Sequence, residues 1–154
     1  MRIGIPAETR PGETRVAATP ETVKKLSGKH QVIVQSGAGL HAAVTDAAYA
    51  AAGATLGSAE DAFGADMVLK VRAPNAQERA AMRPGAVLVG MLNPFDNDNI
   101  AAMAQSRITA FALEAAPRIT RAQSMDVLSS QANIAGYKAV MLAAQGIATG
   151  DIDI

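Results

Sequence analysis

The sequence of 154 residues contains no cysteine and no tryptophan, and its aromatic residues are three phenylalanines and two tyrosines. The lack of cysteine excludes disulfides, thiolate nucleophiles and cysteine-ligated zinc. So few aromatic rings cannot form the stacking platform on which proteins hold single-stranded nucleic acid. The two histidines, His30 and His41, do not have the spacing of a helical pair of zinc ligands. The composition therefore indicates neither a metal site nor a nucleic-acid interface.

The sequence also has no excess of positive or negative charge, since 14 basic residues balance 14 acidic ones. This excludes a basic footprint for DNA or RNA and a polybasic patch for a membrane surface. No apolar run is long enough to span a bilayer. The segment Met1–Ile5 has the pattern of a strand and lacks the apolar region of a signal peptide. We therefore expect a cytoplasmic protein with no nucleic-acid partner and no direct insertion into a membrane.

The residues that are present predict a single α/β domain with a hydrophobic core, because 49% of them are hydrophobic and 18% are charged. Short apolar runs alternate with helix-start signals along the chain. The expected strands cover residues 3–5, 32–34, 67–71, 86–91 and 108–113. The expected helices follow N-cap residues or begin in a polar turn, at Thr19, Thr45, Ser58, Asn75 and Asp98.

Strands that alternate with helices pair in parallel through right-handed crossovers. The sequence therefore predicts a three-layer Rossmann-like or flavodoxin-like domain with a mainly parallel sheet. Such sheets bind ligands beyond the carboxyl ends of their strands. The loops expected at that edge are Ala7–Ala18, Arg72–Asn75, Leu92–Asp96 and Glu114–Asp126.

The motif Gly37-Ala38-Gly39-Leu40-His41-Ala42 follows the second expected strand and has the spacing of a dinucleotide fingerprint. A fingerprint needs a helix that starts at once, so that its amino end meets the pyrophosphate. Here the helix signal comes later, at Thr45. We therefore interpret the glycines as a turn that lets two backbone segments approach closely.

Two groups of charged residues are candidates for a ligand site. Arg10, Glu13 and Arg15 lie in the first loop, where an arginine can bind a carboxylate or phosphate through two hydrogen bonds. Lys70 interrupts an apolar strand, and Arg72 follows it. A lysine in that position either has a buried partner or protects an edge strand against aggregation. The sequence leaves both interpretations of Lys70 open.

The densest polar segment is 117–131, which follows the last expected strand and is rich in Arg, Gln and Ser. It contains no His, Cys, Lys or Tyr, so it is poorly equipped for nucleophilic or acid–base chemistry. Its side chains suit the binding of a polar ligand by hydrogen bonds. The alternative is a capped helix start whose polar residues are simply solvated.

Residues 118–137, RITRAQSMDVLSSQANIAGY, closely resemble the signature of the alpha subunit of proton-translocating NAD(P) transhydrogenases. The opening segment, Ile3–Arg10 with Glu13–Ala17 and Thr19–Glu21, resembles a signature shared with alanine dehydrogenases. The resemblance covers residues 1–145, which we expect to form the alanine dehydrogenase/transhydrogenase N-terminal domain. Residues 146–154 are an unmatched tail, and the NAD-binding Rossmann domain that follows in the family is absent from this sequence.

The resemblance implies an oxidoreductase function, namely hydride transfer between NAD(H) and NADP(H), coupled to proton translocation in the full complex. It implies that Arg118 and Ser129 hold the carboxamide side of the nicotinamide and that Asp126 pairs with Arg118. It also implies that Gln123 reaches toward NADP(H), which the partner subunit carries. This chain alone is then catalytically incomplete and binds NAD(H) poorly or not at all.

The implied partners are the transhydrogenase beta subunit, the membrane domain and a second copy of the alpha subunit. The assembled protein would lie at the cytoplasmic face of the inner membrane as a peripheral subunit. Alternatives are half of an alanine or saccharopine-type dehydrogenase, or a non-catalytic dimerisation or binding module. Arg15 and Lys70 match the pyruvate-binding pair of alanine dehydrogenases. The segment Met91–Phe95, however, lacks their catalytic histidine, so alanine oxidation is not expected.

Overall fold

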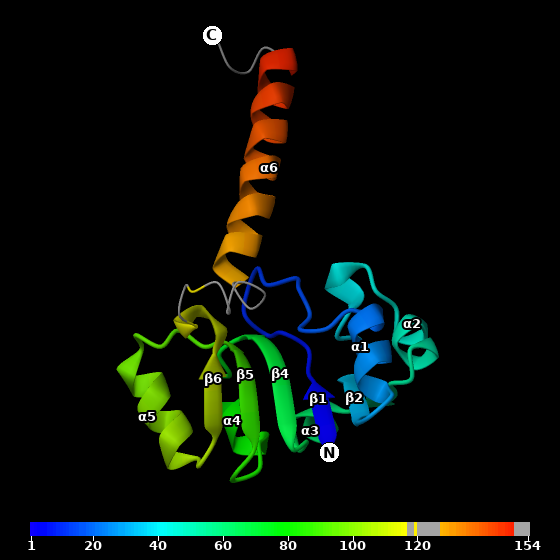
Figure 1. Cartoon of the computed structure of the whole chain (residues 1–154), viewed down its shortest axis with the longest axis vertical. Helices are drawn as coiled ribbons and strands as arrows, with labels where there is room; N and C mark the ends of the chain where they lie inside the picture. Colours follow the sequence, from blue (N-terminus) through cyan, green and yellow to red (C-terminus); the bar gives the residue numbers. More distant parts are fainter. Residues whose placement is uncertain (117–118, 120–126, 150–154) are drawn as a thin grey trace. The chain divides into compact units, whose positions relative to one another are not determined.

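The computed structural model of the chain describes residues 1–116, residue 119 and residues 127–149. The chain divides into two compact units, residues 1–113 and residues 114–154. The first unit is a parallel sheet with helices packed on it (Figure 1). The described part of the second unit consists mainly of one long helix, α6 (Val127–Thr149).

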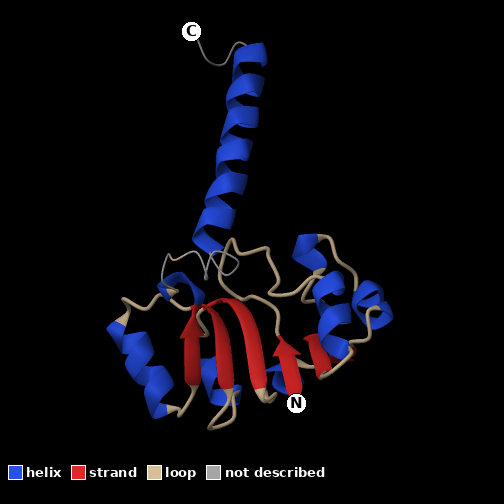
Figure 2. Ribbon diagram, viewed as in Figure 1, coloured by secondary structure: helices blue, strands red, loops and turns tan. Residues whose placement is uncertain are grey.

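The sheet of the first unit has six strands in the order β3-β2-β1-β4-β5-β6, and every pairing is parallel. The arrowheads in Figure 2 accordingly point to one common edge. This order is that of a doubly wound Rossmann fold, so of the two expected arrangements the Rossmann-like one is confirmed. The strands are β1 (Arg2–Ile5), β2 (Gln31–Gln35), β3 (Thr55–Gly57), β4 (Met67–Arg72), β5 (Val87–Met91) and β6 (Thr109–Ala112).

Four helices begin after the N-cap residues that the sequence predicts, whereas the fifth, expected at Asp98, is capped by Asp96 and begins at Asn97. The N-cap residues are Thr19, Thr45, Ser58, Asn75 and Asp96, and each accepts a hydrogen bond from a backbone N–H in the first turn. Asn75 and Glu78 form a reciprocal capping box, as do Ser58 and Asp61. The helices of the first unit are α1 (Pro20–Ser27), α2 (Asp46–Ala51), α3 (Ala59–Phe63), α4 (Ala76–Ala81) and α5 (Asn97–Gln105), with a 3₁₀ turn at Leu40–Ala42 and another, which crosses into the second unit, at Leu113–Ala115.

Two apolar clusters lie on opposite faces of the sheet. On one face, Val23 of α1 and Tyr49 of α2 pack with residues of β1 and β2. On the other face, Phe63 of α3 packs with helix α5 and with residues of β4 and β5, including Val68. Leu69, the next residue along β4, packs against the first cluster. Because neighbouring residues of β4 contribute to different clusters, the domain has the three layers that the sequence predicts.

Strand β3 is the one strand of the first unit that the sequence analysis missed. It is three residues long, it lies at the sheet edge beside β2, and Thr55 and Leu56 are exposed. An edge strand this short has no alternating burial pattern to reveal it. It is recognised only through its pairing with Ile33–Gln35.

The glycine motif after β2 forms a turn, and the helix that follows begins only after Thr45. Gly37 has a φ of +81°, a conformation that side chains other than glycine adopt rarely. A Cβ on Gly39 would lie 2.6 Å from the carbonyl oxygen of Val44. The interpretation of these residues as a close-approach turn is confirmed.

The long helix α6 begins at Val127 and ends at Thr149. It exposes several large apolar side chains, among them Ile134, Tyr137 and Val140. No helix in the part of the chain that the structure describes combines the length and the hydropathy needed to cross a membrane.

The contact between β1 and α3 yields a stability prediction. A Cβ on Gly4 would lie 1.8 Å from the carbonyl oxygen of Ala62, so the two elements must separate to accept any side chain. We expect Gly4→Ala to lower the free energy of unfolding by about 3 kcal/mol. The matched control is Gly28→Ala, because Gly28 has an α-helical φ of −65° and its nearest neighbour would be 3.8 Å away. Urea denaturation should show the control within about 0.5 kcal/mol of the parent. Equal stability of the two variants would contradict the prediction.

Candidate functional site

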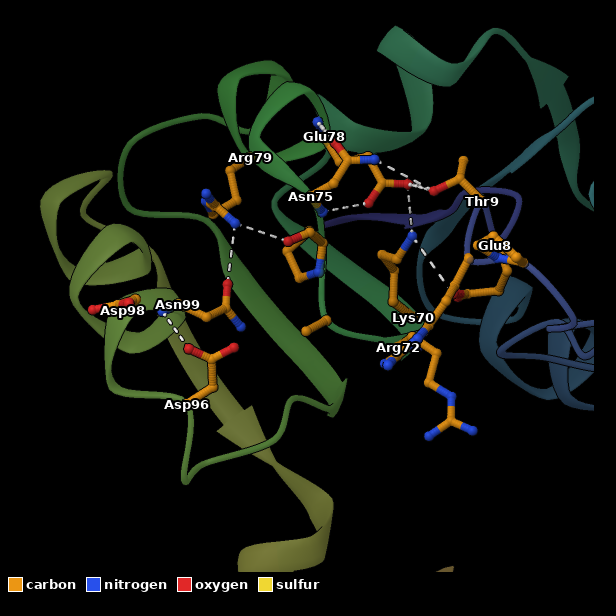
Figure 3. Close-up of a pocket in the computed structure, with 14 residues that line it drawn as sticks. Glu8, Thr9, Lys70, Arg72, Asn75, Glu78, Arg79, Asp96, Asp98 and Asn99 are labelled. Carbon is orange, nitrogen blue, oxygen red and sulfur yellow. Dashed lines mark hydrogen bonds and ion pairs between the residues drawn. The ribbon is translucent and has the colours of Figure 1, made fainter.

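A cavity of about 650 Å³ lies beyond the carboxyl ends of β1 and β4. The strand order reverses between these two strands, and ligands of open α/β sheets bind at that position. Three of the four loops singled out in the sequence contribute to it, and Figure 3 shows the side chains that line it. They come from the loop after β1, the end of β4, helix α4 and the start of α5, and include Glu8, Arg10, Lys70, Arg72, Glu78, Arg79, Asp96 and Asp98.

Lys70 is the centre of a buried ion-pair cluster at the floor of this cavity. Its Nζ atom lies 2.9 Å from Oε1 of Glu78 and 3.6 Å from Oε2 of Glu8. It also lies 5.4 Å from the centre of the Phe63 ring, a distance that allows a cation–π contact. The side chain of Lys70 is 1% exposed, and β4 lies in the interior of the sheet. Of the two interpretations left open by the sequence, the buried partner is confirmed and the edge-strand role is wrong.

Glu8 joins the loop after β1 to the end of β4. Its Oε1 accepts the backbone N–H of Val71 at 2.7 Å, and its Oε2 accepts that of Arg72 at 3.2 Å. Burial raises the pKa of the Glu8 carboxyl above its usual value, although Lys70 and the two N–H groups favour the charged form. Both oxygens of Glu8 are therefore committed to structure.

Glu78 acts at once as a helix cap and as the closest carboxylate to Lys70. Its Oε2 accepts the backbone N–H of Asn75, which completes the capping box of α4. Its Oε1 accepts hydrogen bonds from Lys70 Nζ and from the hydroxyl of Thr9, each at 2.9 Å. The start of α4 is thereby tied to the loop after β1.

A second carboxylate, Glu13, holds two arginines at the mouth of the cavity. Its Oε1 accepts the Nε–H of Arg15 at 2.7 Å, and its Oε2 accepts Arg15 Nη2 at 2.6 Å and Arg72 Nε at 2.8 Å. These guanidinium groups, Arg15 first, lower the pKa of Glu13 to about 2. The cluster links the first loop to β4 a second time.

Neither histidine of the chain is among the described residues that line the cavity. His30 lies in the connection between α1 and β2, and His41 lies in the 3₁₀ turn Leu40–Ala42. The cavity's central ionisable groups, Glu8, Lys70 and Glu78, are bound to one another. The arrangement is therefore suited to orienting a polar ligand rather than to exchanging protons with it.

The structure describes one of the four residues that the sequence analysis assigned to the site, so that assignment stays a prediction. Arg118, Gln123 and Asp126 lie outside the described residues. Ser129 lies in the first turn of α6. Within residues 1–116 and 127–149, no group of three or more histidine, aspartate or glutamate side chains could hold a metal ion.

Two members of the Lys70 cluster, Glu8 and Glu78, were not assigned to a site by the sequence analysis. The capping-box spacing from Asn75 identifies Glu78 as a helix cap only. The signal for Glu8 is its position a few residues beyond a buried strand. Neither pattern predicts that both carboxylates pair with Lys70 of β4.

The Lys70 cluster predicts a pH-dependent loss of stability. Lys70→Met leaves the carboxylates of Glu8 and Glu78 buried without their cation, and we expect it to cost about 3–5 kcal/mol at neutral pH. Burial raises the pKa of the Glu8 carboxyl, and without Lys70 the charged form loses its nearest cation, so protonation of Glu8 relieves part of this cost and the difference from the parent should shrink as the pH is lowered. Urea denaturation at several pH values measures this. The exposed Lys24→Met is the control, and an equally mild effect of both substitutions would refute the role of Lys70.

The Glu13 cluster predicts a second pH dependence, at lower pH and in the parent protein itself. A carboxyl whose pKa falls from 4.5 to about 2 on folding stabilises the protein above 4.5, and this contribution is lost as the pH falls toward 2. We therefore expect Glu13→Gln to have a lower melting temperature than the parent at neutral pH and the same one near pH 2. The exposed Glu60→Gln should show no such convergence. A constant difference across the pH range would be inconsistent with the paired carboxylate.

Comparison with known proteins agrees with this architecture. An NAD(P) transhydrogenase alpha-subunit polypeptide of Rhodospirillum rubrum is 50% identical over 150 residues, which cover 92% of this chain and 39% of that protein. The crystal structure of transhydrogenase from Sinorhizobium meliloti superimposes with a TM-score of 0.91 at 50% identity, over 94% of this chain and 44% of that one. A solved L-alanine dehydrogenase has a TM-score of 0.71 at 32% identity, over 74% of this chain and 32% of that chain.

These relatives are longer than the present sequence, which spans about two fifths of the Rhodospirillum rubrum protein. The family model described as alanine dehydrogenase/PNT, N-terminal domain, matches residues 4–135. The match includes nearly the whole parallel sheet and the cavity at its carboxyl edge. The chain therefore belongs to the alanine dehydrogenase/PNT N-terminal domain family.

Proposed function

We propose that the chain is the first domain, residues 1–145, of the NAD(H)-binding alpha subunit of a proton-translocating NAD(P) transhydrogenase. In the assembled enzyme, a hydride passes directly between NAD(H) and NADP(H). The domain covers the nicotinamide of NAD(H) and presents the segment 118–131 to the partner subunit. The chain spans 39% of the Rhodospirillum rubrum polypeptide, so we assign hydride transfer to the complete assembly and not to this domain alone.

The extent of the likeness carries this proposal. The Rhodospirillum rubrum transhydrogenase polypeptide matches over 92% of the chain at 50% identity. An alanine dehydrogenase of Mycobacterium tuberculosis matches over 60% of the chain at 46% identity. The transhydrogenase match covers a larger share of the chain at a higher identity, and this favours the transhydrogenase assignment.

The chemistry of the cavity supports the same choice. Oxidation of an amino acid to an imine, followed by hydrolysis, requires a group that takes and returns protons. Hydride exchange between two nicotinamides requires alignment, close approach and exclusion of water. The ionisable groups Lys70, Glu8 and Glu78 are held in mutual contacts, and the described lining of the cavity includes no histidine. These features favour a domain that positions a ring over one that transfers protons.

Within the segment 118–131, we assign four residues to the nicotinamide site. Arg118 and Ser129 hold the carboxamide side of the NAD(H) ring. Asp126 pairs with Arg118 and balances the charge of the oxidised ring. Gln123 reaches toward NADP(H). These assignments rest on the resemblance of residues 118–137 to the transhydrogenase signature.

The same proposal names the partners. NADP(H) is supplied by the beta subunit, and the membrane domain conducts the protons. The alpha subunit forms a homodimer and lies at the cytoplasmic face of the inner membrane as a peripheral protein. The exposed apolar side chains of α6, such as Tyr137 and Val140, are consistent with further protein surfaces in the complete assembly.

The function is tested in a complete enzyme. Residues 1–149 of this chain replace the corresponding domain of the Sinorhizobium meliloti subunit, and the assembled complex is assayed for NADPH-dependent reduction of an NAD⁺ analogue. We expect Gln123→Asn to slow hydride transfer about tenfold or more, because shortening the side chain misaligns the two rings. The exposed Arg107→Gln is the control. Unchanged turnover in Gln123→Asn would contradict the role of Gln123 at NADP(H). The proposed function itself would be refuted if the parent chimera were inactive in this assay and formed NADH from alanine and NAD⁺.

A further inference from the structure

Arg72, which lines the cavity, shares a buried carboxylate with a second arginine. One carboxylate, that of Glu13, serves two guanidinium groups, those of Arg15 and Arg72. The Glu13 side chain is 6% exposed, whereas that of Arg72 is 40% exposed. The buried anion therefore anchors Arg72 while its charged end stays accessible to a ligand.

Arg72 is anchored through one nitrogen only. Its Nε donates to Glu13 at 2.8 Å, and its two terminal nitrogens have no partner among the described residues. In Figure 3 its guanidinium extends away from the Lys70 and Glu78 side chains. An arginine oriented by a buried carboxylate, with its terminal N–H groups free, is prepared to bind an oxyanion without losing much side-chain entropy.

A second arginine lines the same cavity. Arg10 comes from the loop after β1, is exposed, and has no side-chain partner within the described part of the chain. The acidic residues Asp96 and Asp98 lie on the far side of the cavity, apart from Arg72 (Figure 3). One oxygen of Asp96 already caps α5 by accepting the backbone N–H of Asn99. Arg10 and Arg72 are therefore two guanidinium groups of the cavity lining whose terminal N–H groups are available to a ligand.

We propose that Arg10 and Arg72 form a phosphate-binding subsite in the cavity, with Glu13 as the positioning residue for Arg72. Two guanidinium groups from separate loops match an anion that offers three or more oxygens, whereas a single guanidinium satisfies a planar carboxylate. The cavity, about 650 Å³, has room for a phosphate carried by a larger molecule as well as for the free ion. The subsite does not depend on the hydride-transfer function proposed above.

The 154-residue chain itself provides the test. Inorganic phosphate is titrated at constant ionic strength while backbone amides and the arginine Nε–Hε signals are followed by NMR. We expect saturable shifts confined to residues 8–15 and 70–75. Arg72→Gln and Arg10→Gln should each weaken phosphate binding about tenfold. The matched control is Arg107→Gln, which removes an exposed arginine that does not line the cavity and should leave the affinity unchanged.

The positioning role of Glu13 has its own signature. Glu13→Gln should weaken phosphate binding and move the Nε–Hε signal of Arg72 toward that of a solvated arginine, in a protein whose amide spectrum remains folded. An unchanged Arg72 signal would remove Glu13 from the subsite. Because the side chain of Arg10 has no partner among the described residues, Arg10→Gln tests the subsite even if Glu13→Gln or Arg72→Gln fails to fold.

Further ligands distinguish the sources of the anion. If NADH shifts the same residues, the phosphate belongs to a nucleotide; if inorganic phosphate binds and NADH does not, the ligand is the free ion. Equal shifts with acetate would overturn the phosphate assignment. Shifts that never saturate, or equal losses in Arg107→Gln and Arg72→Gln, would show general charge screening and would overturn the subsite.

Discussion

The structure depends on the burial of one lysine inside a parallel sheet. Lys70 lies on β4, an interior strand, and its side chain is almost wholly removed from water. An unpaired ammonium in that position would cost several kcal/mol, so carboxylates have to meet it. Glu8 comes from the loop after β1 and Glu78 from the first turn of α4. Satisfying a single charge therefore fixes three separate segments of the chain.

This constraint also explains why the cavity has its shape. The loop after β1 is anchored at Glu8 to the backbone of β4 and at Glu13 to the side chain of Arg72. It is thus tied to β4 at two points beside the carboxyl ends of the strands. The floor consists of one ammonium group held between two carboxylates.

The sequence predicted those features whose physical cause is local. Helix starts were predicted at Thr19, Ser58 and Asn75, because a capping side chain and the backbone that it caps are neighbours in the chain. The parallel sheet follows from alternating strands and helices. Strand β3 was not predicted because it is recognised by its pairing with β2 and not by its own sequence pattern.

The candidate site was predictable only in part, for the same reason. Whether Lys70 is buried or protects an edge depends on the order of the strands, which no local pattern contains. Its contact with Glu8 joins residues more than sixty positions apart, and it becomes visible only when β1 and β4 are seen to be neighbours.

The double role of Glu78 has a consequence for how this family can diverge. One carboxylate starts a helix with Oε2 and compensates the lysine with Oε1. A shorter acid could preserve the cap but would withdraw from the ammonium. An amide would remove the charge and would keep only one of the two acceptor oxygens, so it would lose either the cap or the contact with the lysine. Neither substitution is neutral unless position 70 changes with it. In homologous sequences, the residues at positions 70 and 78 should therefore covary.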